Sequence, residues 1–136
     1  MNAVDTNILI YVHDDRDPAK QATAYALVQA LTSAVLLWQV ACEYIAASRK
    51  IASSGYSIDM AWQDVRKLRT VWLPKFPTLD VLTRAEDLMR RRSLSSWDAL
   101  LVAACLEAGV TRLYTEDFDD SLRAEGLEVI NPFATP

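Results

Sequence analysis

The sequence predicts an α/β fold organised around a mostly parallel sheet, in one domain over residues 1–136. Short apolar runs of strand length alternate with longer helical patterns, and that order of elements favours parallel strands. Acidic residues follow several of the apolar runs. Because the functional crevice of an open α/β sheet lies at the carboxyl ends of its strands, these acids indicate a site at that edge.

The first predicted element is a buried strand that ends at Val4 and places Asp5 at its carboxyl end. Thr6 and Asn7 are residue types common at helix starts, and the apolar run that follows predicts a helix. Asp5 therefore caps this helix or belongs to a metal site. The residue alone favours neither interpretation.

A second helix begins with Asp17 as its N-cap and Pro18 at its first position, and it runs to about Leu31. The apolar stretch 26–41 contains several polar residues, which argues against a membrane-spanning helix. A helix followed by a buried strand over 35–38 explains the stretch better.

The next helix is predicted over about 40–52, and Glu43 lies in its first turn or so. A glutamate there interacts favourably with the helix dipole. It also lies near the carboxyl end of the preceding strand, where it can project into a crevice together with Asp5.

The middle of the chain predicts an amphipathic helix over about 57–70, a short edge strand over 72–76, and a helix that Thr78 caps. Three basic residues end this last helix, where they satisfy its dipole or contact phosphates. They are Arg90, Arg91 and Arg92.

The most apolar helix, about 99–108, is predicted to be buried and to stop at Gly109. Ser95 and Asp98 form a capping-box pattern in front of it. A capping role for Asp98 is therefore plausible, but a carboxylate at the start of a buried helix also suits a crevice.

Two strands complete the predicted sheet, over about 110–115 and 127–130. Glu116 and Asp117 stand at the carboxyl end of the first of them. Right-handed crossovers between parallel strands bring such ends to one edge. The sequence thus gathers Asp5, Glu43, Asp98 and Asp117 there.

Four acids this close together cannot all remain ionised without compensation, because like charges raise one another's pKa. Divalent cations resolve the conflict. Oxygen ligands without histidine or cysteine indicate Mg²⁺ or Mn²⁺ rather than Zn²⁺.

The net charge of −4 speaks against a broad basic surface for nucleic acid, but it does not exclude a nuclease with an acidic metal site. Cys42 and Cys105 are surrounded by apolar residues and are predicted to be small core residues. Two cysteines do not suggest a secreted disulfide scaffold, so we expect a cytoplasmic protein.

Several motifs, in this order and spacing, resemble the PIN-domain nucleases, most closely the ribonuclease toxins of VapBC-type toxin–antitoxin pairs. Each motif is weak alone, whereas the ordered set is specific and covers essentially the whole chain. The motifs are Val4-Asp5-Thr6-Asn7, Glu43 after the second strand, Trp97-Asp98-Ala99-Leu100, Leu113-Tyr114-Thr115-Glu116-Asp117-Phe118 and Val129-Ile130-Asn131-Pro132-Phe133.

The resemblance implies a PIN-like three-layer α/β/α fold and assigns metal-binding and catalytic roles to Asp5, Glu43, Asp98 and Asp117. It places Thr6, Asn7, Thr115 and Glu116 around them. Asp117 fits the family's Thr-x-Asp pattern better than Glu116 does, but the sequence leaves open which of the two faces the metal. Lys50 and Arg90 to Arg92 are candidates for phosphate binding.

The implied activity is hydrolysis of RNA by a Mg²⁺- or Mn²⁺-dependent endoribonuclease, and the implied partners are a small antitoxin and a second copy of the chain. Two alternatives remain: a catalytically silent PIN-like binding module, and a metal-dependent nuclease that acts on DNA. A phosphoryl-accepting receiver domain fits less well. It would need an acid pair after the first strand and a lysine after a late one, and neither is present.

Overall fold

A computed structural model of the chain describes residues 1–118 and 120–134. Within these residues, short parallel strands alternate with helices in a three-layer α/β/α arrangement, as the sequence predicts. The strands are β1 Asn2–Val4, β2 Val35–Leu37, β3 Leu73–Lys75, β4 Arg112–Tyr114 and β5 Glu128–Ile130.

The sheet has two hydrogen-bonded parts, β1–β4–β5 and β2–β3, and every strand pair is parallel. A parallel bridge between Asn2 and Ala34 joins the two parts, so β2 lies beside β1. The spatial order is therefore β3–β2–β1–β4–β5. Parallel strands need crossover connections, and the helices supply them.

The register of the central strands places the residues that follow them side by side. Val4 pairs with Tyr114, and Tyr114 pairs with Ile130. Just past these pairs, the backbone N–H of Asp5 donates to the carbonyl of Tyr114 at 2.9 Å, and that of Thr115 donates to the carbonyl of Ile130 at 3.0 Å. Asp5 and Thr115 therefore meet at the carboxyl edge of the sheet.

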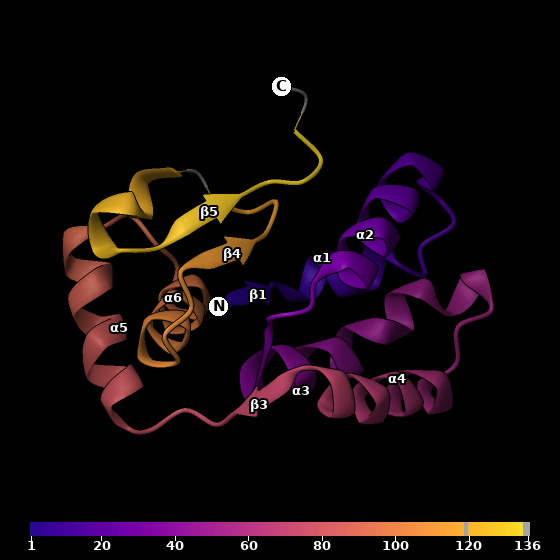
Figure 1. Cartoon of the computed structure of the whole chain (residues 1–136), viewed down its shortest axis with the longest axis horizontal. Helices are drawn as coiled ribbons and strands as arrows, with labels where there is room; N and C mark the ends of the chain where they lie inside the picture. Colours follow the sequence, from indigo (N-terminus) through magenta and orange to yellow (C-terminus); the bar gives the residue numbers. More distant parts are fainter. Residues whose placement is uncertain (119, 135–136) are drawn as a thin grey trace.

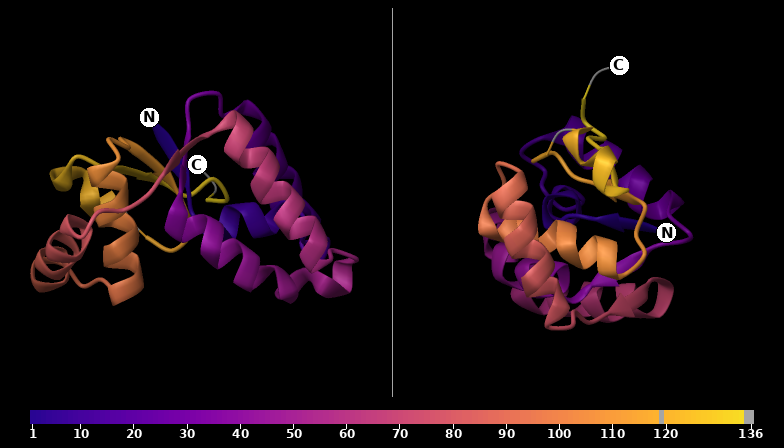
Figure 2. Two further views of the ribbon diagram at one scale, coloured as in Figure 1. Left: turned by 90° about the horizontal axis from the view of Figure 1, so that it is seen from below. Right: turned by 90° about the vertical axis from the view of Figure 1, so that its left-hand side faces the viewer.

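The helices lie in two groups along the long axis of the molecule. Figure 1 shows α5 and α6 together near β4 and β5, and α1 to α4 toward the other end, and the left view of Figure 2 shows the same grouping from below. The helices are α1 Thr6–Tyr11, α2 Pro18–Ala30, α3 Trp38–Ala47, α4 Ile58–Val71, α5 Asp80–Arg91, α6 Ser96–Glu107, and the 3₁₀ segments η1 Ser48–Ser54 and η2 Asp120–Glu125.

Helix α6 supplies much of the core, because its residues 99 and 101–105 are all buried. They pack in one cluster with residues of the central strands such as Ala3 and Leu113, both fully inaccessible. The predicted buried helix is confirmed. Within the described residues, none of the helices is long and apolar enough to cross a membrane.

Three local predictions need correction. Cys105 is buried, but Cys42 is exposed. At 100° per residue, Cys42 lies about 200° from the buried residues Val40 and Tyr44, so it points away from the core despite its apolar neighbours. The predicted helix over 40–52 also differs: α3 begins at Trp38 and ends at Ala47, and a 3₁₀ segment follows.

The cap of α5 is the third correction. Leu79 occupies the N-cap position without a side-chain hydrogen bond. The Thr78 hydroxyl instead donates to the carboxylate of Glu107 at the end of α6. Thr78 therefore joins the two helices of this group and does not cap α5. The predicted cap Asp17 is confirmed.

Candidate active site

Asp5 occupies the centre of the carboxyl edge, and both of its carboxylate oxygens have partners. Oδ1 accepts the backbone N–H of Thr6 at 2.7 Å, which caps α1, and Oδ2 accepts the hydroxyl of Thr115 at 2.8 Å. The residue is only 6% exposed. Asp5 thus caps the helix and also presents a buried carboxylate at the strand ends.

Glu43 approaches Asp5 from α3, and two neighbours orient its carboxylate. The Thr6 hydroxyl donates to Oε2 at 3.1 Å, and the amide of Gln39, one turn earlier, donates to Oε1 at 3.0 Å. Because α3 begins at Trp38, Glu43 lies in the second turn rather than the first.

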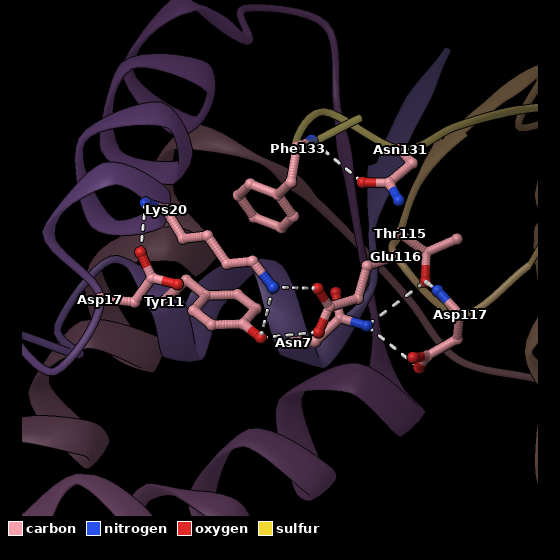
Figure 3. A network of polar contacts seen from close by, with 9 residues as sticks. All are labelled: Asn7, Tyr11, Asp17, Lys20, Thr115, Glu116, Asp117, Asn131 and Phe133. Carbon is pink, nitrogen blue, oxygen red and sulfur yellow. Dashed lines mark hydrogen bonds and ion pairs between the residues drawn. The ribbon is translucent and has the colours of Figure 1, made fainter. Parts of the chain in front are cut away.

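Asp117 approaches from the loop that follows β4. Its Oδ2 accepts the Asn7 amide at 3.0 Å, and its backbone N–H donates to the Thr115 hydroxyl oxygen at 3.1 Å. Figure 3 shows the Asn7 side chain directed at Thr115 and Asp117, away from Glu116. Thr115 therefore connects Asp117 to Asp5 through a single hydroxyl.

Asp98 is the third residue of α6, where its backbone N–H donates to the Ser95 hydroxyl oxygen at 3.2 Å. Only this half of the predicted capping box is formed among the described residues. The Asp98 carboxylate acts on Asp117 at longer range, since its negative charge contributes to raising the pKa of Asp117.

Glu116, by contrast, turns away from these acids. Its two oxygens accept the hydroxyl of Tyr11 at 2.7 Å and the ammonium of Lys20 at 2.9 Å (Figure 3). The two neighbouring acids therefore lie in different surroundings. Asp117 lines the pocket with Asp5 and Glu43, and Glu116 does not.

The pocket has a volume of about 550 Å³, and basic side chains line it together with the acids. Lys50, which the sequence analysis names as a candidate for phosphate binding, is one of these basic residues. Arg16 and Arg49 are the others, and no sequence motif indicated them. The acidic and polar residues that line the pocket are Asp5, Thr6, Asn7, Tyr11, Asp14, Glu43 and Asp117.

The three arginines at the end of α5 do not line this pocket. Arg90 pairs with Glu86 one turn earlier, whereas Arg91 and Arg92 both pair with Glu125. All three arginines are therefore engaged in ion pairs within the protein, and those of Arg91 and Arg92 join α5 to the segment before β5.

The carboxylates influence one another through their charges. Burial raises the pKa of Asp5 to about 6; the hydrogen bonds from Thr115 and Thr6 oppose this shift, and the charges of Asp117 and Glu43 add to it. Burial also raises the pKa of Asp117, and the charges of Glu116 and Asp98 act in the same direction.

Two observations test whether a divalent cation fits this edge. Asn7 Oδ1 is fully buried without a hydrogen-bond partner, and no other side-chain nitrogen or oxygen in the described residues shares that condition. An unpaired buried acceptor beside mutually repelling carboxylates suits a bound cation or its water. The donors are all oxygens, as Mg²⁺ and Mn²⁺ prefer.

The acids nevertheless do not form a closed cage. Among the residues that the structure describes, no three acidic, histidine or cysteine side chains stand close enough together to enclose a metal ion. Asp5, Glu43 and Asp117 share one pocket but are held by separate neighbours. The donor chemistry fits the ion, and the arrangement is an open one.

Comparisons with known proteins agree with this fold. The model of the PIN domain family matches residues 3–125. No curated protein matches the sequence. Among solved structures, a toxin–antitoxin complex from Klebsiella pneumoniae is similar with a TM-score of 0.69 and 18% identity, covering 99% of this chain and 100% of that one.

Two other solved structures are similar over comparable lengths. Mycobacterium tuberculosis VapC20, a sarcin–ricin loop cleaving toxin, has a TM-score of 0.69 and 21% identity over 93% of this chain and 96% of its own. VapBC-1 from nontypeable Haemophilus influenzae has a TM-score of 0.63 and 18% identity over 98% of both chains. Since the family model matches most of its length, the chain belongs to the PIN domain family.

Proposed function

We propose that this chain is a metal-dependent endoribonuclease and the toxin of a toxin–antitoxin pair. One observation carries the proposal: Asp5, Glu43 and Asp117, from three distant segments, line one pocket at the carboxyl edge of the sheet. The charge of Asp98 reaches the same place. A cluster of this kind suits phosphodiester hydrolysis at a carboxylate-held metal better than any other reaction the described residues suggest.

The four acids Asp5, Glu43, Asp98 and Asp117 would hold Mg²⁺ or Mn²⁺. When bound, the ion supplies a water of lowered pKa and neutralises charge on the scissile phosphate. Each carboxylate oxygen has two lone pairs, so the hydrogen bonds that orient Asp5 and Glu43 leave acceptor capacity for a cation.

The neighbouring residues hold these acids in place before substrate arrives. Thr115 fixes Asp5, Thr6 and Gln39 fix Glu43, and Asn7 fixes Asp117. Locked rotamers of this kind reduce the reorganisation needed during the reaction.

Phosphate binding falls to the basic residues that line the same pocket. Lys50 and Arg49 line it and have no carboxylate partner among the described residues, whereas Arg16 is already engaged by both oxygens of Asp14. A substrate phosphate would therefore contact Lys50 or Arg49 in the pocket that the acids also line. The mixed signs of charge explain how an acidic chain can bind a polyanion.

The structurally similar proteins support RNA as the substrate and an antitoxin as the partner, since one is a sarcin–ricin loop cleaving toxin and another is a toxin–antitoxin complex. Such a toxin would act in the cytoplasm. The DNA-nuclease alternative uses the same acids. A silent binding module, in contrast, would have no need for a complete set of four.

The test is to incubate the purified protein with a structured RNA and with single-stranded DNA of the same sequence, in Mn²⁺, in Mg²⁺ and in EDTA. We expect cleavage of the RNA in the presence of metal only. Cleavage of DNA alone would support the DNA-nuclease alternative, and cleavage of neither would support the silent module.

A homodimer is part of the proposal. The sequence offers Trp62, Trp72 and nearby apolar residues for its surface, but the structure favours another surface. Trp72 is only 4% exposed, so it belongs to the core. A larger set of exposed apolar side chains lies around a pocket of about 540 Å³ beside α3, α5 and α6. We name it the aromatic surface, and it consists of Trp38, Phe76, Leu79, Leu82 and Trp97. A second copy would cover it.

The antitoxin is proposed to act through charge. A basic segment entering the acidic pocket would pair with Asp5, Glu43, Asp98 or Asp117 and displace the metal. A preceding amphipathic helix would lie in an apolar groove, and the groove of about 800 Å³ lined from α1, α2 and α4 by residues such as Leu9, Val28 and Leu68 offers the space.

The toxin role is tested in cells. Expression of the chain alone should slow growth, and co-expression with a small protein encoded immediately upstream should restore it. If the folded protein accumulates without slowing growth, the toxin role is wrong even where the nuclease activity survives.

A further inference from the structure

Four segments that are far apart in the sequence meet behind the acidic pocket, around the ammonium of Lys20. They are α1 with Tyr11, α2 with Lys20, the loop after β4 with Glu116, and the segment after β5 with Phe133 (Figure 3). Lys20 Nζ lies 2.9 Å from Glu116 Oε2 and 3.2 Å from the Tyr11 hydroxyl. We call these four residues the Lys20 cluster.

Two aromatic rings also contact the ammonium. Lys20 Nζ lies 4.8 Å from the ring centroid of Tyr11 and 5.3 Å from that of Phe133, and the two rings pack edge to face at 5.0 Å. Cation–π contacts of this geometry are attractive. Asp17 caps α2 at the Lys20 backbone N–H, so the stem of the lysine begins from a fixed turn.

The cluster provides a hydrogen-bond donor for each carboxylate oxygen of Glu116. Tyr11 donates to Oε1 and Lys20 donates to Oε2, so both oxygens are directed at the cluster. The next residue, Asp117, is directed the opposite way by Asn7. Two adjacent acids are thus separated, one into the pocket and one into an ion pair.

The separation of Glu116 from Asp117 is important because both side chains carry negative charge. Glu116 lies close enough to raise the pKa of Asp117 by its negative charge. The ammonium of Lys20 compensates that charge on the far side. Tyr11 itself lines the acidic pocket, so the cluster also fixes part of the pocket wall.

We infer that Lys20 and Tyr11 are positioning residues of the nuclease site: they hold Glu116 in an ion pair outside the pocket and so leave Asp117 as the acid that faces the metal. The inference rests on the proposed metal-dependent activity. It assigns a role to residues outside the motifs that define the acidic site.

The expected behaviour of Lys20→Met differs from a simple loss of stability. Removing the ammonium leaves Glu116 uncompensated beside Asp117, which adds negative charge and a competing ligand. Mn²⁺ should then bind about threefold tighter or more. RNA cleavage at saturating Mn²⁺ should fall by about tenfold or more, because the competing ligand displaces the productive arrangement.

The experiment measures Mn²⁺ affinity by isothermal titration calorimetry and the cleavage rate at saturating Mn²⁺ on the same full-length preparations. Lys20→Met is compared with Lys20→Arg, which keeps the charge, and with Tyr11→Phe, which keeps the ring but loses the hydroxyl. Arg90→Met is the matched control, since it removes a similar ion pair on α5 outside the pocket.

Glu116→Gln completes a double-mutant cycle. In the Lys20→Met background it removes the uncompensated carboxylate, so it should return both the affinity and the cleavage rate most of the way to wild type. Lys20→Arg should resemble wild type, and Tyr11→Phe should show a smaller change in the direction of Lys20→Met.

Two results would overturn the inference while leaving the nuclease activity intact. One is a Lys20→Met variant that behaves like Arg90→Met in both measurements. The other is a parallel loss of affinity, cleavage and thermal stability that Glu116→Gln does not reverse, which would mean a structural role alone. A wild-type protein that binds no Mn²⁺ would refute the proposed activity itself, and the inference with it.

Discussion

The hydroxyl of Thr115 donates a 2.8 Å hydrogen bond to Oδ2 of Asp5, 110 positions earlier in the chain. The hydroxyl oxygen of Thr115 in turn accepts the backbone N–H of Asp117. Thr115 is completely buried. A single hydroxyl therefore connects the acid after β1 to the acid after β4, and its removal should affect both.

We predict that Thr115→Val destabilises the protein by about 1–3 kcal/mol, because it leaves a buried carboxylate oxygen of Asp5 and the partly buried N–H of Asp117 without their partner. It should also lower cleavage, since Asp5 and Asp117 lose their common anchor. Urea denaturation and cleavage assays measure the two effects. Thr115→Ser keeps the hydroxyl and should retain both properties, and a valine variant that matches wild type would contradict this role.

Asp5 should limit the stability of the metal-free protein. Its pKa is raised from 3.8 to about 6 in the folded state, so between these values the folded protein binds more protons than the unfolded chain. Stability contributed by the protonated carboxyl is present below pH 4 and is lost as pH rises through 6.

Asp5→Asn, which keeps a good N-cap, removes this dependence. In EDTA at pH 7 we expect the variant to exceed wild type in unfolding free energy by on the order of 2–3 kcal/mol, with the difference shrinking toward pH 4. Denaturation at several pH values measures it. An equal pH dependence in the two proteins would show that Asp5 is not the group responsible.

Lys50 and Arg90 provide a comparison between a pocket cation and a cation used within the fold. Lys50→Ala should weaken RNA binding by about threefold to tenfold and reduce the salt dependence of binding, because one phosphate contact is lost. Arg90→Ala loses only a contact with Glu86 and should bind as wild type does. Filter binding at two salt concentrations measures the RNA affinity of both variants. An equal loss of affinity in the two would show that Lys50 does not contact a phosphate.

The aromatic surface predicts the oligomeric state. Phe76 is 75% exposed there, and Phe76→Asp should convert a dimer into a monomer of 15.2 kDa in sedimentation analysis. Trp62 is 50% exposed on α4, away from that surface, so Trp62→Asp should leave the dimer intact. A wild-type protein that is monomeric at micromolar concentration would contradict the dimer.

The sequence predicts the elements and the acids because both depend on local patterns. The strand that ends at Val4 places Asp5 at the carboxyl edge, and the apolar helix after Asp98 is buried as its composition requires. The capping role of Asp5 is confirmed, since one oxygen caps α1; the metal-binding role remains a proposal, and the other oxygen accepts Thr115.

What the sequence leaves undecided depends on partners that are distant in the chain. Glu116 and Asp117 are adjacent and chemically alike, but their partners lie about a hundred positions earlier: Lys20 and Tyr11 for Glu116, and Asn7 for Asp117. Arg91 likewise pairs with Glu125, 34 positions later. No local pattern encodes such pairings, so sequence analysis could not separate the acid that lines the pocket from its neighbour.

The central claim is that Asp5, Glu43, Asp98 and Asp117 hold a divalent ion for RNA cleavage. Its most direct test is the initial rate of RNA cleavage as Mn²⁺ is raised from zero, for wild type, Asp5→Asn and Asp98→Asn, each shown to be folded by circular dichroism. We predict a wild-type rate that saturates with Mn²⁺ and vanishes in EDTA, and loss of most of that rate in both variants. Cleavage that persists in EDTA, or two variants as active as wild type, would contradict the account.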